Sequence, residues 1–384
     1  MRLGQREKEL LGGAHGETVA EALRGQIEVG DFFGAERFVP VGNVHMMGDI
    51  EVMGEGGLEF LRRVAESGAR CAVNTTTNAR CFDFGYAGRL GQDPENVARE
   101  RVLISYLREI GVMTTDTCIN YQAVYQPHLG EHVAWGDTGT VIYANSVLGA
   151  RSNFEGGPAA LAASLTGVTP AYGFHLDENR RGNILVQLEA TLESLSDWGA
   201  VGRIVGEGHQ DYTSVPVFTG IDRSPTADEL KHLGASLASH GSMGMYHIVG
   251  VTPEARTVDD AFGSNEPQAT VTVTDEDLEN LYATYETGDG DANLVVFSAP
   301  QLSLYELKTL SELLQGKRVS EGTSLIVTTN GAYKAAGEAL GYLRDIEEAG
   351  GLVLEGVCFY ILDGVARMRE ENGWDNLVTN SAKL

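Results

Sequence analysis

The sequence is poor in basic residues, and above all in lysine. Lys and Arg together number 28 against 54 Asp and Glu, which gives a formal net charge of −26 and a sequence pI near 4.6. The lysines are Lys8, Lys231, Lys308, Lys317, Lys334 and Lys383. No stretch gathers Lys and Arg, and so negative a surface repels phosphate backbones and anionic headgroups. We therefore expect no binding to nucleic acid or to membrane surfaces.

An acidic, lysine-poor surface suits concentrated salt. Salt at about 1 M shortens the Debye length to about 3 Å and removes most of the self-repulsion of such a surface. We interpret the composition as halophilic. The first residues are charged, and no apolar run reaches the ~18 residues of a membrane span. We therefore expect no signal peptide, no membrane span and a cytoplasmic location.

Cysteines are few and far apart, at Cys71, Cys81, Cys118 and Cys358. In a reducing cytoplasm such residues are buried thiols or metal ligands rather than disulfide partners. The sequence also lacks a Walker loop, a Rossmann glycine fingerprint, a His-Glu-x-x-His motif and a Gly-x-Ser-x-Gly motif. It thus gives no support to nucleotide use or to hydrolysis by a catalytic triad.

The 384 residues, 42% of them hydrophobic, are enough for a folded protein of two or three lobes. Apolar patterning near the C-terminus predicts strand, helix, strand, helix, strand over 293–297, 304–314, 323–327, 335–349 and 352–360. A comparable series is predicted over 38–44, 57–66, 69–74, 95–110 and 112–115. This alternation predicts an α/β fold with mainly parallel strands and flanking helices, in approximate lobes 1–128, 129–290 and 291–384.

A short repeat follows the middle strand of each series. It is Thr76-Thr-Asn78 in the first series and Thr328-Thr-Asn330 in the second. In open α/β sheets, ligands bind beyond the carboxyl ends of the strands, where both repeats are expected to lie. The alternative is that Thr and Asn simply suit strand exits and turns.

Polar side chains that surface exposure and helix capping do not explain gather between His128 and Arg181. They are Asn145, Arg151, Asn153, His175, Asn179 and Arg180. Amide and guanidinium groups of this kind can bind a carboxylate or a phosphate. The alternative is a polar network that fixes contacts between lobes.

The sequence closely resembles the aconitase X family. The resemblance covers nearly the whole chain. It rests on Asp116-Thr-Cys, Glu131-His-Val-Ala-Trp, Tyr143-Ala-Asn-Ser-Val-Leu-Gly-Ala-Arg-Ser-Asn, Asp177-Glu-Asn-Arg and Thr379-Asn-Ser-Ala-Lys. It implies one aconitase-like catalytic unit over residues 1–384, paired with a small swivel-domain subunit around an iron–sulfur cluster, expected to be 4Fe-4S.

The activity that this resemblance implies is that of the large catalytic subunit of an iron–sulfur-dependent hydro-lyase. In the family an open iron acts as a Lewis acid on the hydroxyl group of a small anionic hydroxy acid. The first expectation is dehydration of (R)-5-phosphomevalonate to trans-anhydromevalonate 5-phosphate. The alternative substrates are cis-3-hydroxyproline or another hydroxy acid. By analogy with aconitase, a serine of the partner subunit is the candidate base.

One family ligand position departs from the pattern. Cys118 and Cys358 match two of the three cluster cysteines, whereas the third position is Ala299, whose methyl group cannot coordinate iron. Cys71 and Cys81 could replace it in principle, but buried apolar roles suit them better. The alternative to a dehydratase is therefore a cluster-free paralogue that acts as a binding or regulatory subunit. The chain also ends soon after the Ser-Ala-Lys motif, so we expect a shortened C-terminal lobe.

Candidate substrate-binding residues come from the polar segment and from the resemblance. His45 matches a family histidine, and Lys383 lies in the family's Ser-Ala-Lys motif. The alternative for His45 is a turn-capping role. The full set of candidates is His45, Asn78, Asn145, Ser146, Arg151, Asn153, His175, Asn179, Arg180 and Lys383.

Overall fold

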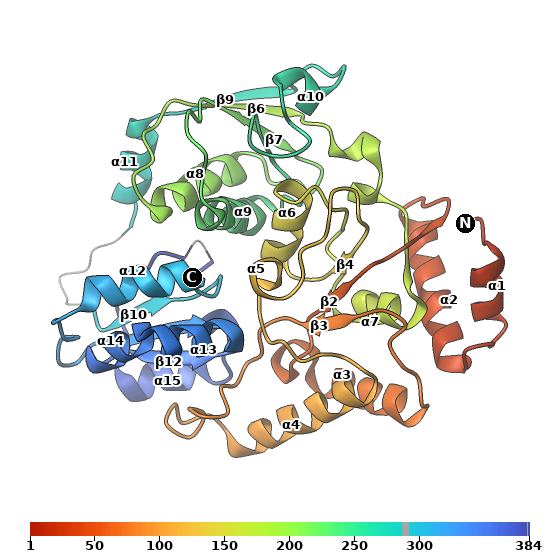
Figure 1. Ribbon diagram of the computed structural model, residues 1–384, viewed down its shortest axis with the longest axis horizontal. Helices are drawn as coiled ribbons and strands as arrows, with labels where there is room; N and C mark the ends of the chain where they lie inside the picture. Colours follow the sequence, from red (N-terminus) through yellow and green to blue (C-terminus); the bar gives the residue numbers. More distant parts are fainter. Residues whose placement is uncertain (286–291, 382) are drawn as a thin grey trace.

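The computed structural model describes residues 1–285, 292–381 and 383–384. Within these ranges the strands form four small sheets, three of which consist only of parallel strands. The three parallel sheets occupy different parts of the molecule, and helices flank each of them (Figure 1). The prediction of an α/β fold with several packed lobes and mainly parallel strands is confirmed.

The first parallel sheet has the strand order β3-β2-β4. Its strands are β2 (Val44–Met46), β3 (Thr75–Thr77) and β4 (Ala134–Trp135). The helices of this region are α1 (Gln5–Leu11), α2 (Glu17–Phe32), α3 (Ile50–Glu66), α4 (Pro94–Glu109) and α7 (Gly157–Thr166). A separate antiparallel pair joins β1 (Phe38–Pro40) to β5 (Val168–Pro170).

The predicted helices 57–66 and 95–110 correspond to α3 and α4. The α3 helix starts earlier than predicted, because the Asp49 carboxylate accepts a hydrogen bond from Val52 N at 3.1 Å and caps the helix at Ile50. The first predicted strand, 38–44, is split between β1 and β2, which belong to different sheets.

The strand predicted over 69–74 is wrong, and Cys71 therefore does not lie in a strand. In this segment Cys71 N bonds to Ile110 O and Ala72 N bonds to Ser164 O, so its amides cap helix ends instead of pairing with a strand. The strand predicted over 112–115 reduces to a single bridge between Met113 and Thr76.

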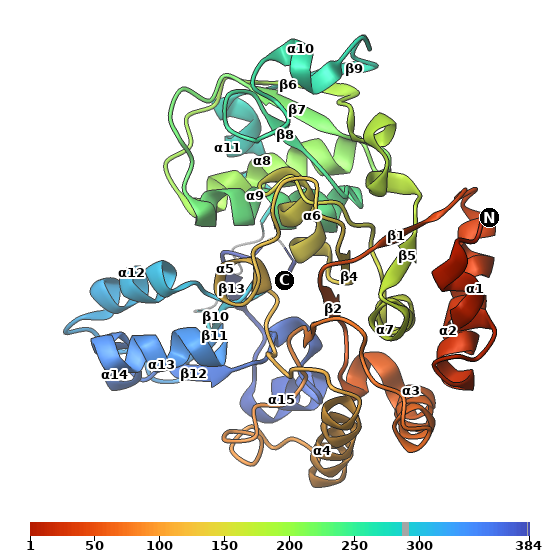
Figure 2. The same cartoon turned by 45° about the vertical axis from the view of Figure 1, so that its right-hand side comes forward.

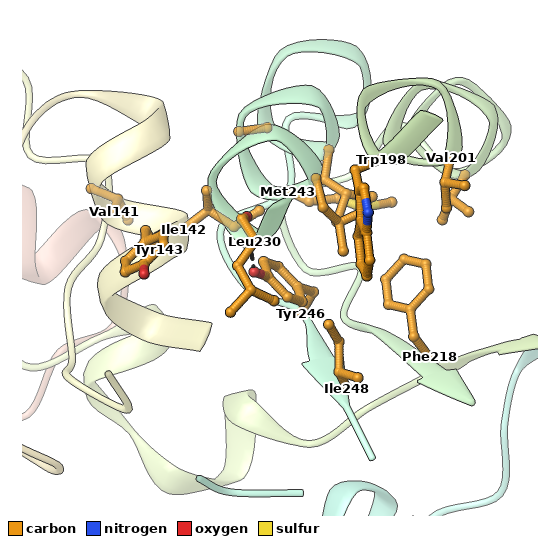
Figure 3. Packing of buried hydrophobic residues seen from close by; sticks show 14 of the residues in the cluster. Val141, Ile142, Tyr143, Trp198, Val201, Phe218, Leu230, Met243, Tyr246 and Ile248 are labelled. Atoms are coloured by element: carbon orange, nitrogen blue, oxygen red, sulfur yellow. Dashed lines mark hydrogen bonds between the residues drawn. The ribbon is translucent and has the colours of Figure 1, made fainter. Parts of the chain in front are cut away.

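The second parallel sheet has the order β8-β7-β6-β9. Its strands are β6 (Ile184–Leu188), β7 (Pro216–Thr219), β8 (His247–Ile248) and β9 (Ala269–Val273), and its helices are α8 (Leu195–Gly208), α9 (Ala227–Gly241), α10 (Val258–Phe262) and α11 (Asp275–Ala283). Helices α8 and α9 approach closely, because a Cβ at Gly202 would lie 2.8 Å from Leu233 O. Large buried side chains, among them Trp198, Phe218 and Tyr246, fill the space between these helices, the sheet and α6 (Thr138–Ser146) (Figure 3).

The third parallel sheet has the order β12-β11-β10-β13. Its strands are β10 (Leu294–Phe297), β11 (Ser324–Thr329), β12 (Leu352–Glu355) and β13 (Leu377–Thr379), and its helices are α12 (Leu304–Leu314), α13 (Gly331–Leu340), α14 (Tyr342–Glu348) and α15 (Val365–Asn372). The predicted strand–helix–strand–helix–strand order is confirmed, with two differences. The predicted helix 335–349 is divided at Gly341, whose φ of 82° ends α13. The strand predicted to reach residue 360 ends at Glu355, before Gly356 at φ 68°.

Both Thr-Thr-Asn repeats occupy the predicted strand ends. Thr77 ends β3 and Thr329 ends β11, so Asn78 and Asn330 follow the carboxyl ends of parallel strands. Their surroundings differ, because Asn330 caps α13 through a hydrogen bond from Tyr333 N at 2.9 Å, whereas Asn78 lines a cavity.

The first and third lobes meet at the carboxyl ends of their strands. Arg80, just past β3, bridges to Val357, just past β12, and its amide bonds to Gly356 O at 2.9 Å. Figure 2 shows the C-terminus at the centre of the molecule, between α5 (Asn120–Ala123), the third sheet and the first sheet. No helix within the described residues is long and apolar enough to cross a membrane.

Candidate active site

A cavity of about 500 Å³ lies where the three lobes meet. All three lobes contribute to its lining, which consists of Met47, Asn78, Cys118, Gly136, Asp137, Thr138, Ala238, Ser239, His240, Ala299, Cys358, Tyr360, Ile361 and Lys383. We call it the cysteine cavity. It brings together the two predicted cluster cysteines, the alanine at the third ligand position, and two of the predicted substrate-binding residues, Asn78 and Lys383.

The two thiols of the cysteine cavity are both buried. Cys118 follows Asp116, and its Sγ accepts a hydrogen bond from Gln301 N at 3.2 Å. Cys358 follows β12, and its Sγ lies 3.9 Å from Ser298 Oγ. Burial raises the pKa of both thiols, and the proximity of Cys358 raises that of Cys118 further. Both are therefore thiols rather than thiolates in the absence of a bound cation.

Ala299 occupies the remaining corner of the cysteine cavity. It has φ 54° and packs with Ala79 and Cys358. The neighbouring Ser298 hydroxyl is already engaged, since it lies 2.7 Å from Thr328 Oγ1 and accepts a hydrogen bond from Phe359 N. Within the described residues, neither Ala299 nor the Ser298 hydroxyl therefore replaces the third thiol at this corner.

The other two cysteines lie elsewhere. Cys71 contacts Ser164 at 3.7 Å, and Cys81 is buried near Asp49 and Glu100. Across the described part of the chain, no group of three or more His, Cys, Asp or Glu side chains is placed to hold a metal ion. The cysteine cavity therefore does not fit a cluster held by three cysteines of this chain.

A charged pair, Lys383 and Asp137, lines the same cavity as the thiols. Lys383 Nζ donates to Thr138 Oγ1 at 3.1 Å and lies 3.7 Å from Asp137 Oδ1, which also receives a 3.4 Å contact from Asn78 Nδ2. Burial alone would lower the pKa of Lys383, but the nearby Asp137 carboxylate outweighs burial and raises the pKa. Lys383 is thus a cation that lines the cysteine cavity.

The start of α6 fixes the position of the Asp137 side chain. It is the N-cap of α6, where its carboxylate accepts a hydrogen bond from Thr140 N at 3.1 Å. Asp137 and Thr138 are not among the residues predicted from the sequence. The capping pattern Asp137-Thr-Gly-Thr directly after Trp135-Gly was the available signal.

His45 lies in β2 and does not line the cysteine cavity. The imidazole is fully buried, and its Nδ1 lies 2.7 Å from Thr76 Oγ1. Burial lowers the pKa of His45 to about 4, against the opposing effect of Asp137. His45 is therefore neutral at physiological pH.

Comparison with known proteins agrees with this geometry. Models of the aconitase X first, second and third domains match residues 1–178, 182–283 and 292–384. The chain belongs to the aconitase X family. The resemblance stated from the sequence is thereby confirmed.

Aconitase X relatives of this chain are named dehydratases. The phosphomevalonate dehydratase large subunits of Thermococcus kodakarensis and Methanothermobacter thermautotrophicus are 34% and 36% identical to it, over 100% and 99% of this chain and 94% and 92% of theirs. The cis-3-hydroxy-L-proline dehydratase of Pseudomonas aeruginosa is 32% identical over 100% of this chain and 65% of its own length. The crystal structure of Thermococcus kodakaraensis aconitase X in its holo-form matches with a TM-score of 0.88 at 33% identity, covering 100% of this chain and 94% of that one.

The boundaries of the aconitase X domain models differ from the predicted lobes. The models divide the chain after residues 178 and 283, whereas the predicted lobes divide it at 128/129 and 290/291. The second of these predicted boundaries falls within 286–291, outside the described residues. The lobe boundaries stay predictions.

Besides His45, seven predicted substrate-binding residues do not line the cysteine cavity, and internal hydrogen bonds engage them. Asn145 and Ser146 lie in the last turn of α6, where Asn145 Nδ2 donates to Gly244 O at 2.8 Å and Ser146 Oγ accepts from Tyr246 N. Arg180 is 2% exposed, donates to Asn145 O at 2.9 Å and pairs with Glu254. These contacts join α6 to the segments that carry Arg180, Gly244 and Tyr246.

The remaining four residues are engaged nearby. Arg151 pairs with Asp177, and Asn153 Nδ2 donates to Tyr172 O at 3.0 Å. His175 Nδ1 lies 2.9 Å from His132 Nδ1, and Asn179 Nδ2 donates to Gly173 O.

Two of these residues, Arg151 and Arg180, line a second cavity of about 520 Å³. This cavity shares no lining residue with the cysteine cavity. The structure thus divides the predicted substrate-binding residues into two groups, and their roles in binding stay predictions.

Proposed function

We propose that this chain is the large subunit of a hydro-lyase that removes water from a small anionic hydroxy acid. The first-choice substrate is (R)-5-phosphomevalonate, with trans-anhydromevalonate 5-phosphate as product. The observation that carries this proposal is the convergence of Cys118, Cys358, Asn78 and Lys383, from distant parts of the chain, on one cavity. Full-length similarity to phosphomevalonate dehydratase large subunits supports the choice of substrate.

Lys383 would bind the substrate anion. Its ammonium group is largely buried, with a side chain 15% exposed, so a carboxylate or phosphate beside it is attracted more strongly than in open water. Asn78 and Thr138 offer further polar atoms next to Lys383. These groups can orient an anion. We assign no residue of this chain as the base that removes the substrate proton during dehydration.

The chain would act together with a small swivel-domain subunit. Its relatives carry the name large subunit, which implies a smaller partner in those proteins. An iron–sulfur cluster is expected from the family, but the cysteine cavity offers two thiols and Ala299 where three thiolates are needed. We therefore assign no step of the reaction to a cluster.

The second candidate function is a cluster-free binding or regulatory subunit. Ala299 favours this candidate, because alanine at this position supplies no metal ligand. The residues that can bind an anion, Asn78, Thr138 and Lys383, line the same cavity. Cis-3-hydroxyproline remains the alternative substrate for a catalytic chain.

The test is a dehydration assay on the chain purified anaerobically in high salt with its small subunit. Loss of water from phosphomevalonate, followed by mass spectrometry, is the expected result, with cis-3-hydroxy-L-proline turned over more slowly. Lys383→Met is expected to raise KM strongly. Lys334→Met serves as the control, because Lys334 lies on α13 near Glu355 and outside the cavity. Binding of phosphomevalonate without turnover would favour the second candidate.

A further inference from the structure

Arginines gather at the second cavity, although basic residues are scarce in this chain. The basic residues that line it are Arg151, Arg180, Arg181 and Arg256. We call it the arginine cavity. The acidic residues that line it are Asp177, Glu254 and Asp260. Because the guanidinium groups outnumber the carboxylates, this cavity attracts anions, whereas the chain as a whole, with its net charge of −26, repels them.

Two of the three carboxylates are already paired within the cavity wall. Arg151 pairs with Asp177 and donates to His175 O at 3.2 Å. Arg180 Nη2 lies 2.6 Å from Glu254 Oε1. These pairs hold the wall in place, and each paired carboxylate repels a bound anion less than a free one would.

The other donors of the arginines are available to a ligand. Arg151 Nε is buried and has no hydrogen-bond partner in the described part of the chain. A buried N–H without a partner is costly, so a missing acceptor is expected next to it. Arg181 uses Nη1 to donate to Asp260 O at 2.9 Å. Arg256 is exposed and forms no hydrogen bond or ion pair with any described residue.

His247 adds a buried acceptor to the same cavity. It lines the cavity and is 1% exposed. Its Nε2 lies 2.8 Å from Arg180 O, which can only accept, so Nε2 carries the proton. Burial lowers the pKa of the imidazole, and the ring is therefore neutral at physiological pH. Its Nδ1 is then an acceptor, and it has no partner among the described residues.

We propose that the arginine cavity binds a small anion that carries a hydroxyl group, with its charged oxygens on the arginines and its hydroxyl donating to His247 Nδ1. Hydrogen phosphate and hydroxylated organic anions share this chemistry. The volume of about 520 Å³ lies within the range of about 300–1,000 Å³ that is usual for small-molecule sites. The site goes beyond the proposed function, which places the substrate in the cysteine cavity.

The test is equilibrium dialysis of radiolabelled phosphate against the full chain, at constant KCl concentration and about pH 8. Every variant carries Lys383→Met, which removes the cation that could hold phosphate in the cysteine cavity. We expect the chain with Lys383→Met alone to bind one phosphate. Addition of Arg256→Gln is expected to weaken this binding about tenfold, the effect of one hydrogen bond to a charged group.

Arg318→Gln is the matched control for Arg256→Gln and is expected to leave phosphate binding unchanged. Arg318 is likewise exposed and without a hydrogen bond or ion pair to any described residue. It lines neither the arginine cavity nor the cysteine cavity. Neither exchange removes an internal contact, so both variants are expected to fold.

Sulfate tests the role of His247. At about pH 8 phosphate and sulfate are both dianions, but only phosphate keeps a proton that it can donate to Nδ1. Phosphate is therefore expected to bind about tenfold more tightly than sulfate. His247→Phe keeps a ring without nitrogen atoms and is expected to remove this preference. If His247→Phe fails to fold, the ratio of the two affinities in the chain with native His247 still decides.

Glycerol 3-phosphate distinguishes the two sources of the ligand. Tighter binding of glycerol 3-phosphate than of phosphate would assign the cavity to a hydroxylated organic anion, and the reverse order would assign it to the free ion. Both orders support the site.

Three outcomes would overturn the proposal. They are absence of phosphate binding in the Lys383→Met chain, equal affinities of the Arg256→Gln and Arg318→Gln variants, and equal affinities for phosphate and sulfate. None of them bears on dehydration, which is assigned to the cysteine cavity. Phosphate binding at the arginine cavity in a chain that dehydrates no hydroxy acid would overturn the proposed function alone.

Discussion

Glu100→Gln is expected to remove much of the pH dependence of folding stability. Glu100 is buried in α4, where burial and the nearby Asp49 carboxyl raise its pKa from 4.5 to about 8. Burial likewise raises the pKa of Asp49 to about 6. The folded chain therefore keeps protons on this pair at pH values where the unfolded chain has lost them.

The sign and size of the effect follow from this difference in proton binding. Between pH 4.5 and about 8 the folded state holds the Glu100 proton and the unfolded state does not, so each rise of one pH unit lowers the free energy of unfolding by about 1.4 kcal/mol. Over the whole interval the loss is about 5 kcal/mol. A glutamine at this position can still accept the hydrogen bond from Ile50 N, which lies 2.8 Å from Glu100 Oε2 in the native chain.

The assay is urea unfolding, followed by tryptophan fluorescence at constant salt, at several pH values from 5 to 9. The stability of Glu100→Gln minus that of the native chain is expected to increase by about 1.4 kcal/mol per pH unit and to level off above about pH 8. Glu109→Gln, at the exposed end of the same helix, should show no such trend. A constant difference between Glu100→Gln and the native chain across the pH series would refute the reasoning.

Three further predictions concern other parts of the molecule. Lys231→Met leaves Glu306 and Asp228 without their buried cation and is expected to cost about 3–5 kcal/mol of unfolding free energy in urea; a loss below 1 kcal/mol would contradict the role given to this pair. Ala299→Cys adds a third thiol to the cavity, and we expect more iron and acid-labile sulfide per chain after anaerobic reconstitution than in the native chain; equal contents would show that this corner does not face the cluster site. Thermal unfolding is expected to shift to higher temperature as salt rises to about 1 M, and an unchanged midpoint would refute the halophilic interpretation.

Much of the fold could be predicted from the sequence because several of its elements carry strong local signals. The α12 helix begins with Ser303 and Glu306, a capping box followed by helical periodicity. The strands of the first lobe were harder to place, because β2 and β3 have three residues each and no alternation to mark them. The positions of these strands depend on pairing between distant segments. The strand expected over 69–74 therefore lies at β3, Thr75–Thr77, instead.

The candidate site was predictable only in part. Cys118, Cys358, Asn78 and Lys383 were identified by motif, and the structure brings them to one cavity. The amide and guanidinium groups of Asn145 and Arg180 have the same chemistry as a substrate-binding group, but here they bond to backbone and side-chain atoms of the chain itself. Residue type alone cannot distinguish a donor that faces a ligand from one that joins two lobes.

Substrate protection of the cavity thiols tests the central claim most directly. In the complex with the small subunit, saturating phosphomevalonate is expected to slow alkylation of Cys118 and Cys358 by iodoacetamide, measured peptide by peptide by mass spectrometry. Cys71 lies outside the cavity and should react at the same rate with and without substrate. Unchanged alkylation rates at both cavity thiols would contradict the account that the substrate binds in the cysteine cavity.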